Sequence, residues 1–487
     1  ERMFKKVVLG TVLFFASVVV AFFLLIKVID FNEYKPRIQK TIKDVLGYEV
    51  AIKGDITLSL SPVGVRIFDV EIKNPYHKPH EAFAKVGAFD IAVEIAPLLK
   101  KEIKVKHIAF EKLNLNIEKS KEGHYNFEKL ADISNKKQKE TNATKQADKE
   151  EYFSLININK VKFSEATVLF NNAQTNNKVS AEKLNLFLDN ISLDSTKSSK
   201  LQGLSFKADI SIEKLLFNHY TFANVSTNVQ MKDALISMEE LQYTLFDSLF
   251  QGSGKLDISG QVPRISVKQK VQELKLAKIS EHFFGKAVFE GNANAEVKLA
   301  SLLADKNTTR STLGGFIAIQ GENIYLQGYD LDALAAKINE QDTFDPSAIE
   351  QLLLKPSQDA NKTSTRLKQL VIKTDIGYSE VKLSDVAMST DKYRMAIKGA
   401  INIVEERFLD VKMAFIDDGG CATFEQTITG KFQKPKLKLD ESVINSVARS
   451  ALSLFGKSKK EQEELVIRPE EPCVPFYQGE VKSPKNP

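Results

Sequence analysis

Apolar and polar residues alternate along most of this chain. Between residues 50 and 60 the apolar side chains share one parity, while small polar or charged residues occupy most of the positions between them: Val50, Ile52, Ile56, Leu58 and Leu60. A period of two is typical of a β-strand with one buried face. Strands of parallel sheets are buried on both faces and read as continuous apolar runs, so we expect antiparallel strands with one wet face and one apolar face.

The same alternation recurs far along the chain. It continues through Val65 to Ile67 and resumes at Val70, so one residue near Asp69 changes its phase, as a β-bulge does. Further short segments of the same kind are Leu113 to Ile117, Leu184 to Leu186, Ile265 to Val267, Ile401 to Ile403 and Leu437 to Leu439. We therefore expect a mostly β fold, with the chain forming a long meandering sheet.

Few segments have the period of a helix. Asn32 to Leu46 carries one apolar stripe and ends at Gly47, which predicts an amphipathic helix next to the sheet. The other expected helices are Leu274 to Phe284, Asp330 to Asn339, Asp345 to Leu354 and Glu441 to Phe455. We expect the last one to cap an open edge of the sheet; lying on a membrane or a partner is its alternative role.

An uncharged run of twenty residues, Val7 to Ile26, precedes all of these elements. As a helix it would be about 30 Å long, which is the thickness of a bilayer's hydrocarbon core. Arg2, Lys5 and Lys6 precede the run and favour a cytoplasmic N-terminus. A cleaved signal peptide would have a shorter apolar core and a small-residue cleavage site. We expect a retained single-pass anchor, with the bulk of the chain across the membrane.

The stretch 134–151 is almost entirely polar and is expected to be a flexible linker. The predicted organisation is an anchor at 1–29, a β module at 30–133, the linker at 134–151, an extended β domain at 152–440 with helical insertions near 274–284 and 330–355, and a C-terminal helix and tail at 441–487.

Composition excludes several classes of function. Of the 487 residues 43% are hydrophobic, which suffices for a large core, and the net charge of only +5 leaves no basic face for nucleic acid. His77 and His80 form the one close histidine pair, without further ligands nearby, and read as a surface loop. The sequence contains no nucleophile-elbow, zinc-protease or phosphate-loop motif. We expect no enzyme activity, no metal and no cofactor.

The two cysteines, Cys421 and Cys473, are far apart and match no metal-binding pattern. In an oxidising compartment a bond between them would pin the C-terminal tail to the body of the protein. Two buried free thiols are the alternative.

Several local motifs resemble one family. The stretch from Phe31 to Asp55, which follows the uncharged run, is similar to the opening of AsmA-family envelope proteins of Gram-negative bacteria. Leu274-Lys-Leu-Ala-Lys-Ile, with the glycine-marked Gly285 to Gly291 after it, looks like an internal motif of that family, and so does Ile324 to Asp332. Gly420-Cys421 and Pro472-Cys473 resemble its C-terminal cysteine pair.

This resemblance implies a repeating β-groove, in which a curled antiparallel sheet encloses a hydrophobic channel. Relatives are implicated in phospholipid transport to the outer membrane and in outer-membrane assembly, and the family offers no catalytic residues. The partners it implies are phospholipid, the inner membrane through the N-terminal helix, and a component of the outer membrane. The localisation implied is the inner membrane, with the bulk of the chain periplasmic.

The alternating apolar positions are the candidates for a lipid-facing surface. They are Val50, Ile52, Ile56, Leu58, Leu60, Val65, Ile67, Leu113, Leu115, Ile117, Leu184, Leu186 and Leu188. The packed core of a β-sandwich would use the same pattern, although the chain lacks the Trp of immunoglobulin-like domains. The alternative function is a scaffold that presents sheet edges to outer-membrane proteins by strand addition.

Overall fold

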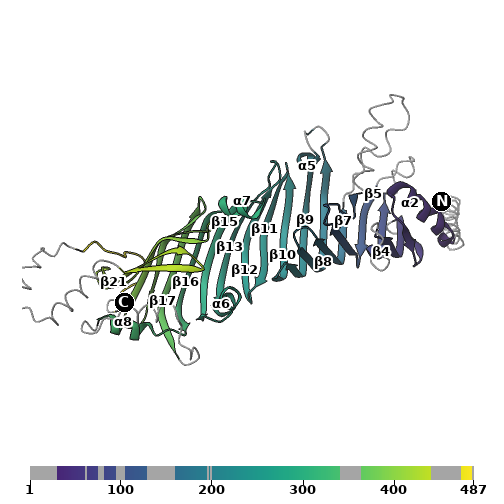
Figure 1. Ribbon diagram of the computed structural model, residues 1–487. Coiled ribbons are helices and arrows are strands. Elements are labelled where there is room, and N and C mark those ends of the chain that lie inside the picture. The colour runs from purple at the N-terminus through teal and green to yellow at the C-terminus, as the bar shows by residue number, and fades with distance from the viewer. Residues whose placement is uncertain are drawn as a thin grey trace, which may run out of the picture. The chain divides into compact units, whose positions relative to one another are not determined.

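The computed structural model describes residues 30–60, 63–74, 82–94, 105–128, 160–194, 197, 200–339, 363–439 and 473–484 (Figure 1). The chain divides into two compact units, Glu1–Asp233 (unit 1) and Ala234–Pro487 (unit 2). The described residues are mostly β, with a few short helices, as the sequence predicts.

Several predicted elements lie outside the described residues: the anchor at 1–29, the linker at 134–151, and the helices at 345–354 and 441–455. The predicted domain boundaries therefore stay a prediction. None of the helices in the described part of the chain combines the length and the apolar character needed to cross a bilayer.

Unit 1 consists of one sheet with helical turns at its start and near β9. Its elements are η1 (Phe31–Tyr34), α2 (Lys35–Leu46), β1 (Val50–Ile52), β2 (Ile56–Leu60), β3 (Val63–Lys73), β4 (Ala82–Val93), β5 (Val105–Glu111), β6 (Asn114–Lys119), β7 (Lys160–Asn172), β8 (Asn177–Leu193), α5 (Lys200–Gly203), β9 (Leu204–Phe217) and β10 (Tyr220–Lys232).

Unit 2 is also built from antiparallel strands, with three short helices among its described residues. Its elements are β11 (Leu235–Leu245), β12 (Ser248–Asp257), β13 (Arg264–Lys275), α6 (Leu276–Phe284), β14 (Phe289–Glu290), β15 (Asn292–Leu302), α7 (Lys306–Ser311), β16 (Gly314–Gln327), α8 (Leu331–Asn339), β17 (Ser364–Gly377), β18 (Glu380–Ser389), β19 (Arg394–Asn402), β20 (Arg407–Ile416), β21 (Ala422–Lys431) and β22 (Lys434–Leu439).

The strand pairing corrects the expectation of a purely antiparallel sheet. β7 runs parallel to both β5 and β6, whereas the other assigned strand pairs are antiparallel. A parallel neighbour needs a long crossover connection, and residues 120–159 separate β6 from β7. Side-chain alternation does not report strand direction, so the sequence pattern missed this pair.

The predicted strand from Val50 to Leu60 is two strands. Ile52 pairs with Val70 and Ile56 with Ile67, so three residues on this side face two on β3. The amide of Gly54 donates to the carbonyl of Phe68 across the break, at 3.2 Å. The extra residue of this bulge lies in 53–55, opposite the phase change that the sequence places near Asp69.

A line of left-handed residues crosses the sheet of unit 1. Asp69, Lys112, Glu165, Lys183 and Asn224 have φ between +49° and +52° on successive parts of the sheet. Each one changes the alternation by one residue, so that in β3, for example, the side chains before and after Asp69 pack into the same apolar cluster. The predicted phase change is thus confirmed, and left-handed residues recur between β5 and β6 and in β7, β8 and β10.

The amphipathic helix predicted at Asn32 to Leu46 is confirmed, with its first turn as the 3₁₀ helix η1. Asp30 Oδ1 accepts a hydrogen bond from the Asn32 amide at 2.9 Å, and Gly47 ends α2 at φ +69°. Ile38 and Ile42 pack against the apolar side chains of β1 and β2.

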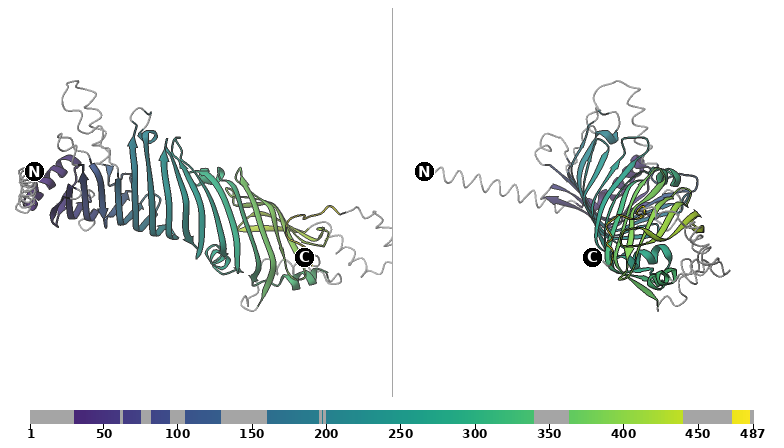
Figure 2. Two further views of the ribbon diagram at one scale, coloured as in Figure 1. Left: turned by 180° about the vertical axis from the view of Figure 1, so that it is seen from behind. Right: turned by 90° about the vertical axis from the view of Figure 1, so that its left-hand side faces the viewer.

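Two helices of unit 2 match predicted segments, and they lie along one end of its strands (Figures 1 and 2). α6 contributes Leu276 and α8 contributes Leu331, Leu334 and Ala335 to the largest buried cluster, together with side chains of the sheet. These helices therefore cover one face of the sheet at that end.

The C-terminal tail 473–484 covers the opposite face of β17 to β20. Val481 is 1% exposed and packs against Val371, Ala387 and Ala396. Tyr477 Oη donates to Asp385 at 2.7 Å, and Arg394 donates to the carbonyl of Val481 at 3.0 Å. A disulfide joins Cys421 to Cys473, with a Cα–Cα distance of 6.1 Å, as the sequence analysis expected.

Removing this disulfide should destabilise unit 2 and free the tail. The bond closes a loop with a sequence separation of 52, for which chain entropy gives about 4 kcal/mol as an upper value. We expect the Cys421→Ser, Cys473→Ser double variant to lose about 2–4 kcal/mol of unfolding free energy in urea and to be cleaved by protease near residue 473. An unchanged cleavage pattern would show that the polar and apolar contacts of the tail hold it without the bond.

Candidate functional site

One row of paired residues crosses the sheet of unit 1 and is apolar along most of its length. Residues that pair directly across strands point to the same face. The row consists of Ile56, Ile67, Phe89, Phe110, Phe163, Leu186 and Ile210, and it ends at Thr227. The Phe89 and Phe110 rings are 4.9 Å apart, and the Phe110 and Phe163 rings stack at 4.8 Å. We call the face that carries this row the inner face.

A second row lies two residues away on the same face. It consists of Leu58, Val65, Ile91, Ile108, Val161, Leu188, Ala208 and Val229. Across the line of left-handed residues a further row follows, with Ile117, Phe170, Val179, Phe217 and Tyr220. The inner face of unit 1 is therefore a broad apolar surface, and not a single stripe.

The described residues do not cover this surface as a closed core would be covered. Most of its side chains are half-buried, Val65 is 37% exposed and Phe217 is 47% exposed. The strands of unit 1 belong to one sheet, so its described residues supply no second sheet to cover the face. α2 packs on β1, η1 on β2, and α5 on β8 and β9. Exposed apolar surface of this extent in a soluble domain usually marks a binding site.

The opposite, outer face is rich in charges. Arg66 lies 3.4 Å from Asp90 and 2.7 Å from Glu111, and Lys183 lies 2.6 Å from Glu213. Burial raises the pKa of Asp90 in spite of the guanidinium beside it. Arg66, Asp90 and Glu111 also line a hollow of about 440 Å³ on this face. The sheet of unit 1 is thus amphipathic, with an apolar inner face and a charged outer face.

The structure separates the predicted groove residues into two groups. Val50, Ile52 and Ile56 are buried under α2, and Leu113 and Leu115 pack with Tyr48 and Phe83 in a second small cluster. The half-buried or exposed group on the inner face contains Leu58, Val65, Ile67, Ile117, Leu184, Leu186 and Leu188. Leu60 ends β2, and its side chain is outside the description.

Sequence reasoning missed the centre of the surface. Phe89, Phe110 and Phe163 form the continuous aromatic part of the row, yet none was among the candidates. Their signal is the short alternation in Ile108-Ala-Phe110 and Val161-Lys-Phe163. It is hard to see because Lys112 and Glu165 change the phase two residues later.

Unit 2 has an apolar row of its own, and that row is largely covered; we call the face that carries it the inner face of unit 2. Tyr243, Phe250, Val271, Ala295, Ile319 and Ile372 pair in sequence across β11 to β17. The Tyr243 and Phe250 rings stack at 5.1 Å, and burial raises the pKa of Tyr243 to about 12. α6 and α8 pack on this side, so here the inner face is a filled core.

No three His, Cys, Asp or Glu side chains in the described part of the chain gather as a metal site requires. The sequence matches the AsmA family over residues 3–211 and 202–383. The chain belongs to the AsmA family. No curated protein matches this AsmA-family chain.

Because the inner face of unit 1 is open, truncating one of its apolar side chains should lower the free energy of unfolding only slightly. Leu188→Ala removes a half-buried side chain, whereas Leu367→Ala in unit 2 removes one that is 0% exposed. We expect a loss of about 1 kcal/mol for Leu188→Ala and about 3 kcal/mol for Leu367→Ala. Hydrogen exchange of the β8 and β17 peptides measures the two losses of stability. Equal losses would mean that the inner face of unit 1 is a packed core.

Proposed function

We propose that this AsmA-family chain carries phospholipids across an aqueous gap, with their acyl chains on the inner face of unit 1. The observation that carries the proposal is the unbroken apolar row from Ile67 to Ile210, which crosses six strands without a charged residue. The proposal assigns no catalytic step and no cofactor to the chain.

Acyl chains resist the crossing of water for a simple physical reason. Each methylene exposed to water costs roughly 0.8 kcal/mol, so two long chains present a barrier that is prohibitive without protein. A half-buried apolar face lowers this barrier because acyl carbons replace water against Phe110, Phe163 and their neighbours. The headgroup meanwhile stays in solvent.

The dimensions suit a conduit for several lipids. The row from Ile56 to Thr227 spans eight neighbouring strands, which corresponds to about 34 Å at a spacing of about 4.8 Å. This is close to the thickness of a bilayer's hydrocarbon core, about 30 Å. Unit 1 alone therefore offers continuous apolar contact over a distance longer than a headgroup's width.

The proposed setting follows from the N-terminal sequence and the family. The uncharged run Val7 to Ile26 anchors the chain in the inner membrane, and the two units lie in the periplasm. Phospholipid enters from the inner membrane and leaves toward the outer membrane. A disulfide in unit 2 is consistent with an oxidising compartment of this kind.

The scaffold alternative, strand addition at a sheet edge, has less support. β22 pairs with β21 and carries Lys434, Pro435, Lys436 and Lys438, which are exposed. Lysine and proline on an edge strand oppose the addition of another strand. At the start of unit 1, Asn32 Oδ1 of η1 accepts the amide of Ile56 at 3.0 Å, so η1 occupies one backbone group that a strand added beside β2 would need.

Two adjacent residues of β8 offer a matched test. Leu186 lies on the inner face, whereas Phe187 pairs with Lys162 and Asp209 on the outer face, and both side chains are half-buried. In full-length chain reconstituted into vesicles, Leu186→Asp should reduce transfer of a fluorescent phospholipid at least tenfold, because a carboxylate interrupts the apolar row. Phe187→Asp should leave transfer within about twofold.

A photo-crosslinking residue at either position gives an independent reading. We expect phospholipid to be captured from Leu186 and not from Phe187. Equal capture from both faces, or full transfer by Leu186→Asp with an intact fold, would contradict the proposal.

A further inference from the structure

Helix α8 closes the inner face of unit 2 where the sheet is most apolar. Leu331, Leu334 and Ala335 pack in one cluster with Ile324 and Leu367, which are both 0% exposed. Met395, Phe415 and Phe424, from β19, β20 and β21, belong to the same cluster. The space that lipid would occupy on the inner face of unit 1 is here filled by the chain itself.

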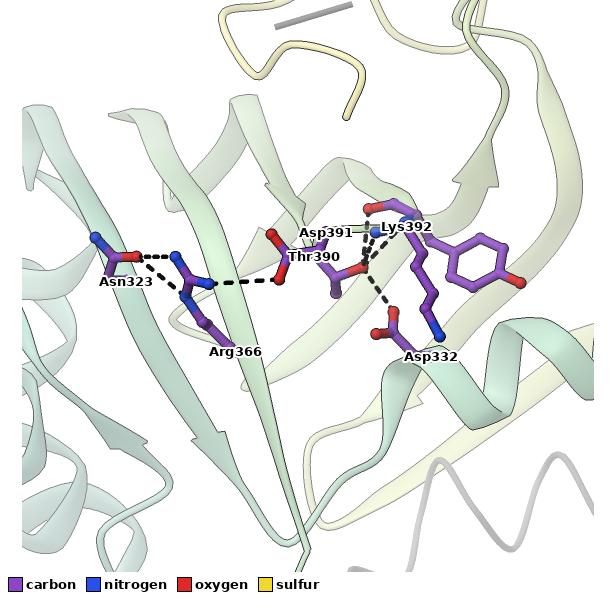
Figure 3. A network of polar contacts seen from close by, with 7 residues as sticks. Asn323, Asp332, Arg366, Thr390, Asp391 and Lys392 are labelled. Atoms are coloured by element: carbon purple, nitrogen blue, oxygen red, sulfur yellow. Dashed lines mark hydrogen bonds and ion pairs between the residues drawn. The ribbon is translucent and has the colours of Figure 1, made fainter. Parts of the chain in front are cut away.

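Polar contacts at the first turn hold α8 in place. Thr390, in the turn between β18 and β19, donates from Oγ1 to Asp332 Oδ1 at 2.6 Å (Figure 3). The same oxygen accepts the amides of Lys392 and Tyr393, at 3.1 and 3.0 Å. Thr390 is 3% exposed and Asp332 is half-buried, so this bond is partly shielded from water.

A second threonine fixes the residues that lead into the helix. Thr365 Oγ1 accepts the amide of Leu331 at 2.9 Å and donates to the carbonyl of Tyr329 at 2.7 Å. Asp330 accepts the amide of Ala333 and caps the helix. We call the Asp332–Thr390 contact the clasp, because it is the side-chain bond in this set that joins α8 to the far strands β18 and β19.

We propose that α8 is a removable stopper within unit 2: it covers the apolar stretch of β17 to β20 and exposes that stretch to lipid when the clasp opens. The inference rests on the proposed function and adds a second, regulated lipid-binding surface to it. The stretch beneath α8 has the composition of the open surface in unit 1, with apolar residues in consecutive pairs such as Leu370 with Met388 and Met395 with Phe415.

The test compares an open, a conservative and a locked form of the full-length chain. Asp332→Ala removes the acceptor, Asp332→Asn keeps an oxygen for Thr390, and the Asp332→Cys, Thr390→Cys variant places two thiols where the clasp oxygens lie, so that oxidation locks the helix. Each form carries a photo-crosslinking residue either at Met388, on the inner face of β18, or at Phe163 in unit 1, and is reconstituted with phospholipid vesicles.

We expect capture of phospholipid from Met388 to rise roughly tenfold in Asp332→Ala, the shift expected when one shielded hydrogen bond is lost. Asp332→Asn should stay near the parent level, and the locked form should show no capture from Met388. Capture from Phe163 should be the same in all forms.

Two results would overturn the stopper. One is capture from Met388 in the locked form; the other is unchanged capture in Asp332→Ala when its circular dichroism matches that of the parent. Absence of capture from Phe163 in every form would instead contradict the proposed function, so the two failures are distinguishable.

Discussion

A single β-sheet with one apolar face must have that face covered, because each exposed apolar side chain raises the free energy of the folded state in water. The described parts of the chain meet this requirement in different ways. α2 covers the first strands of unit 1, and α6 and α8 cover the inner face of unit 2. The middle of unit 1 has no such cover among its described elements, and Phe89, Phe110 and Phe163 remain half-buried there.

The outer face of unit 2 obeys the same rule. β17 to β20 carry apolar side chains on both faces, so the outer side needs its own cover, and the tail around Val481 supplies it. The disulfide at Cys473 keeps that short segment close to the sheet, where its few contacts would otherwise compete with chain entropy. The covered faces thus serve the stability of the fold, whereas the uncovered face of unit 1 is the part proposed to bind lipid.

Left-handed residues in several strands of unit 1 shift the alternation by one residue, and so the apolar side chains stay on the inner face. A non-glycine residue in this conformation costs about 1–2 kcal/mol, yet Asp69, Lys112, Glu165 and Lys183 all adopt it. Without the phase change that each one introduces, the apolar parity would pass to the outer face halfway along the strand. Keeping the inner face continuous offsets this local cost.

The amino-acid pattern predicts the local part of this structure well. Alternation identifies β8 through Leu184, Leu186 and Leu188, and the helical period with Gly47 identifies α2, because both signals depend on neighbouring residues. Contacts between distant segments are not encoded in such a pattern. The parallel pairing of β7, the burial of Val50 under α2 and the contact of Thr390 with α8 each depend on which segments meet. The candidates Val50, Ile52 and Ile56 therefore proved to be packed, while Leu58 and Val65 lie on the open surface.

The lipid content of the protein tests the central claim most directly. The full-length chain would be expressed with its N-terminal run in the membrane and then cleaved between residues 29 and 30. The released part would be analysed by native mass spectrometry without detergent. The account predicts more than one phospholipid per chain, and loss of that lipid in Leu186→Asp. A stably folded chain without lipid would contradict it, because the inner face of unit 1 would then be covered by the protein alone.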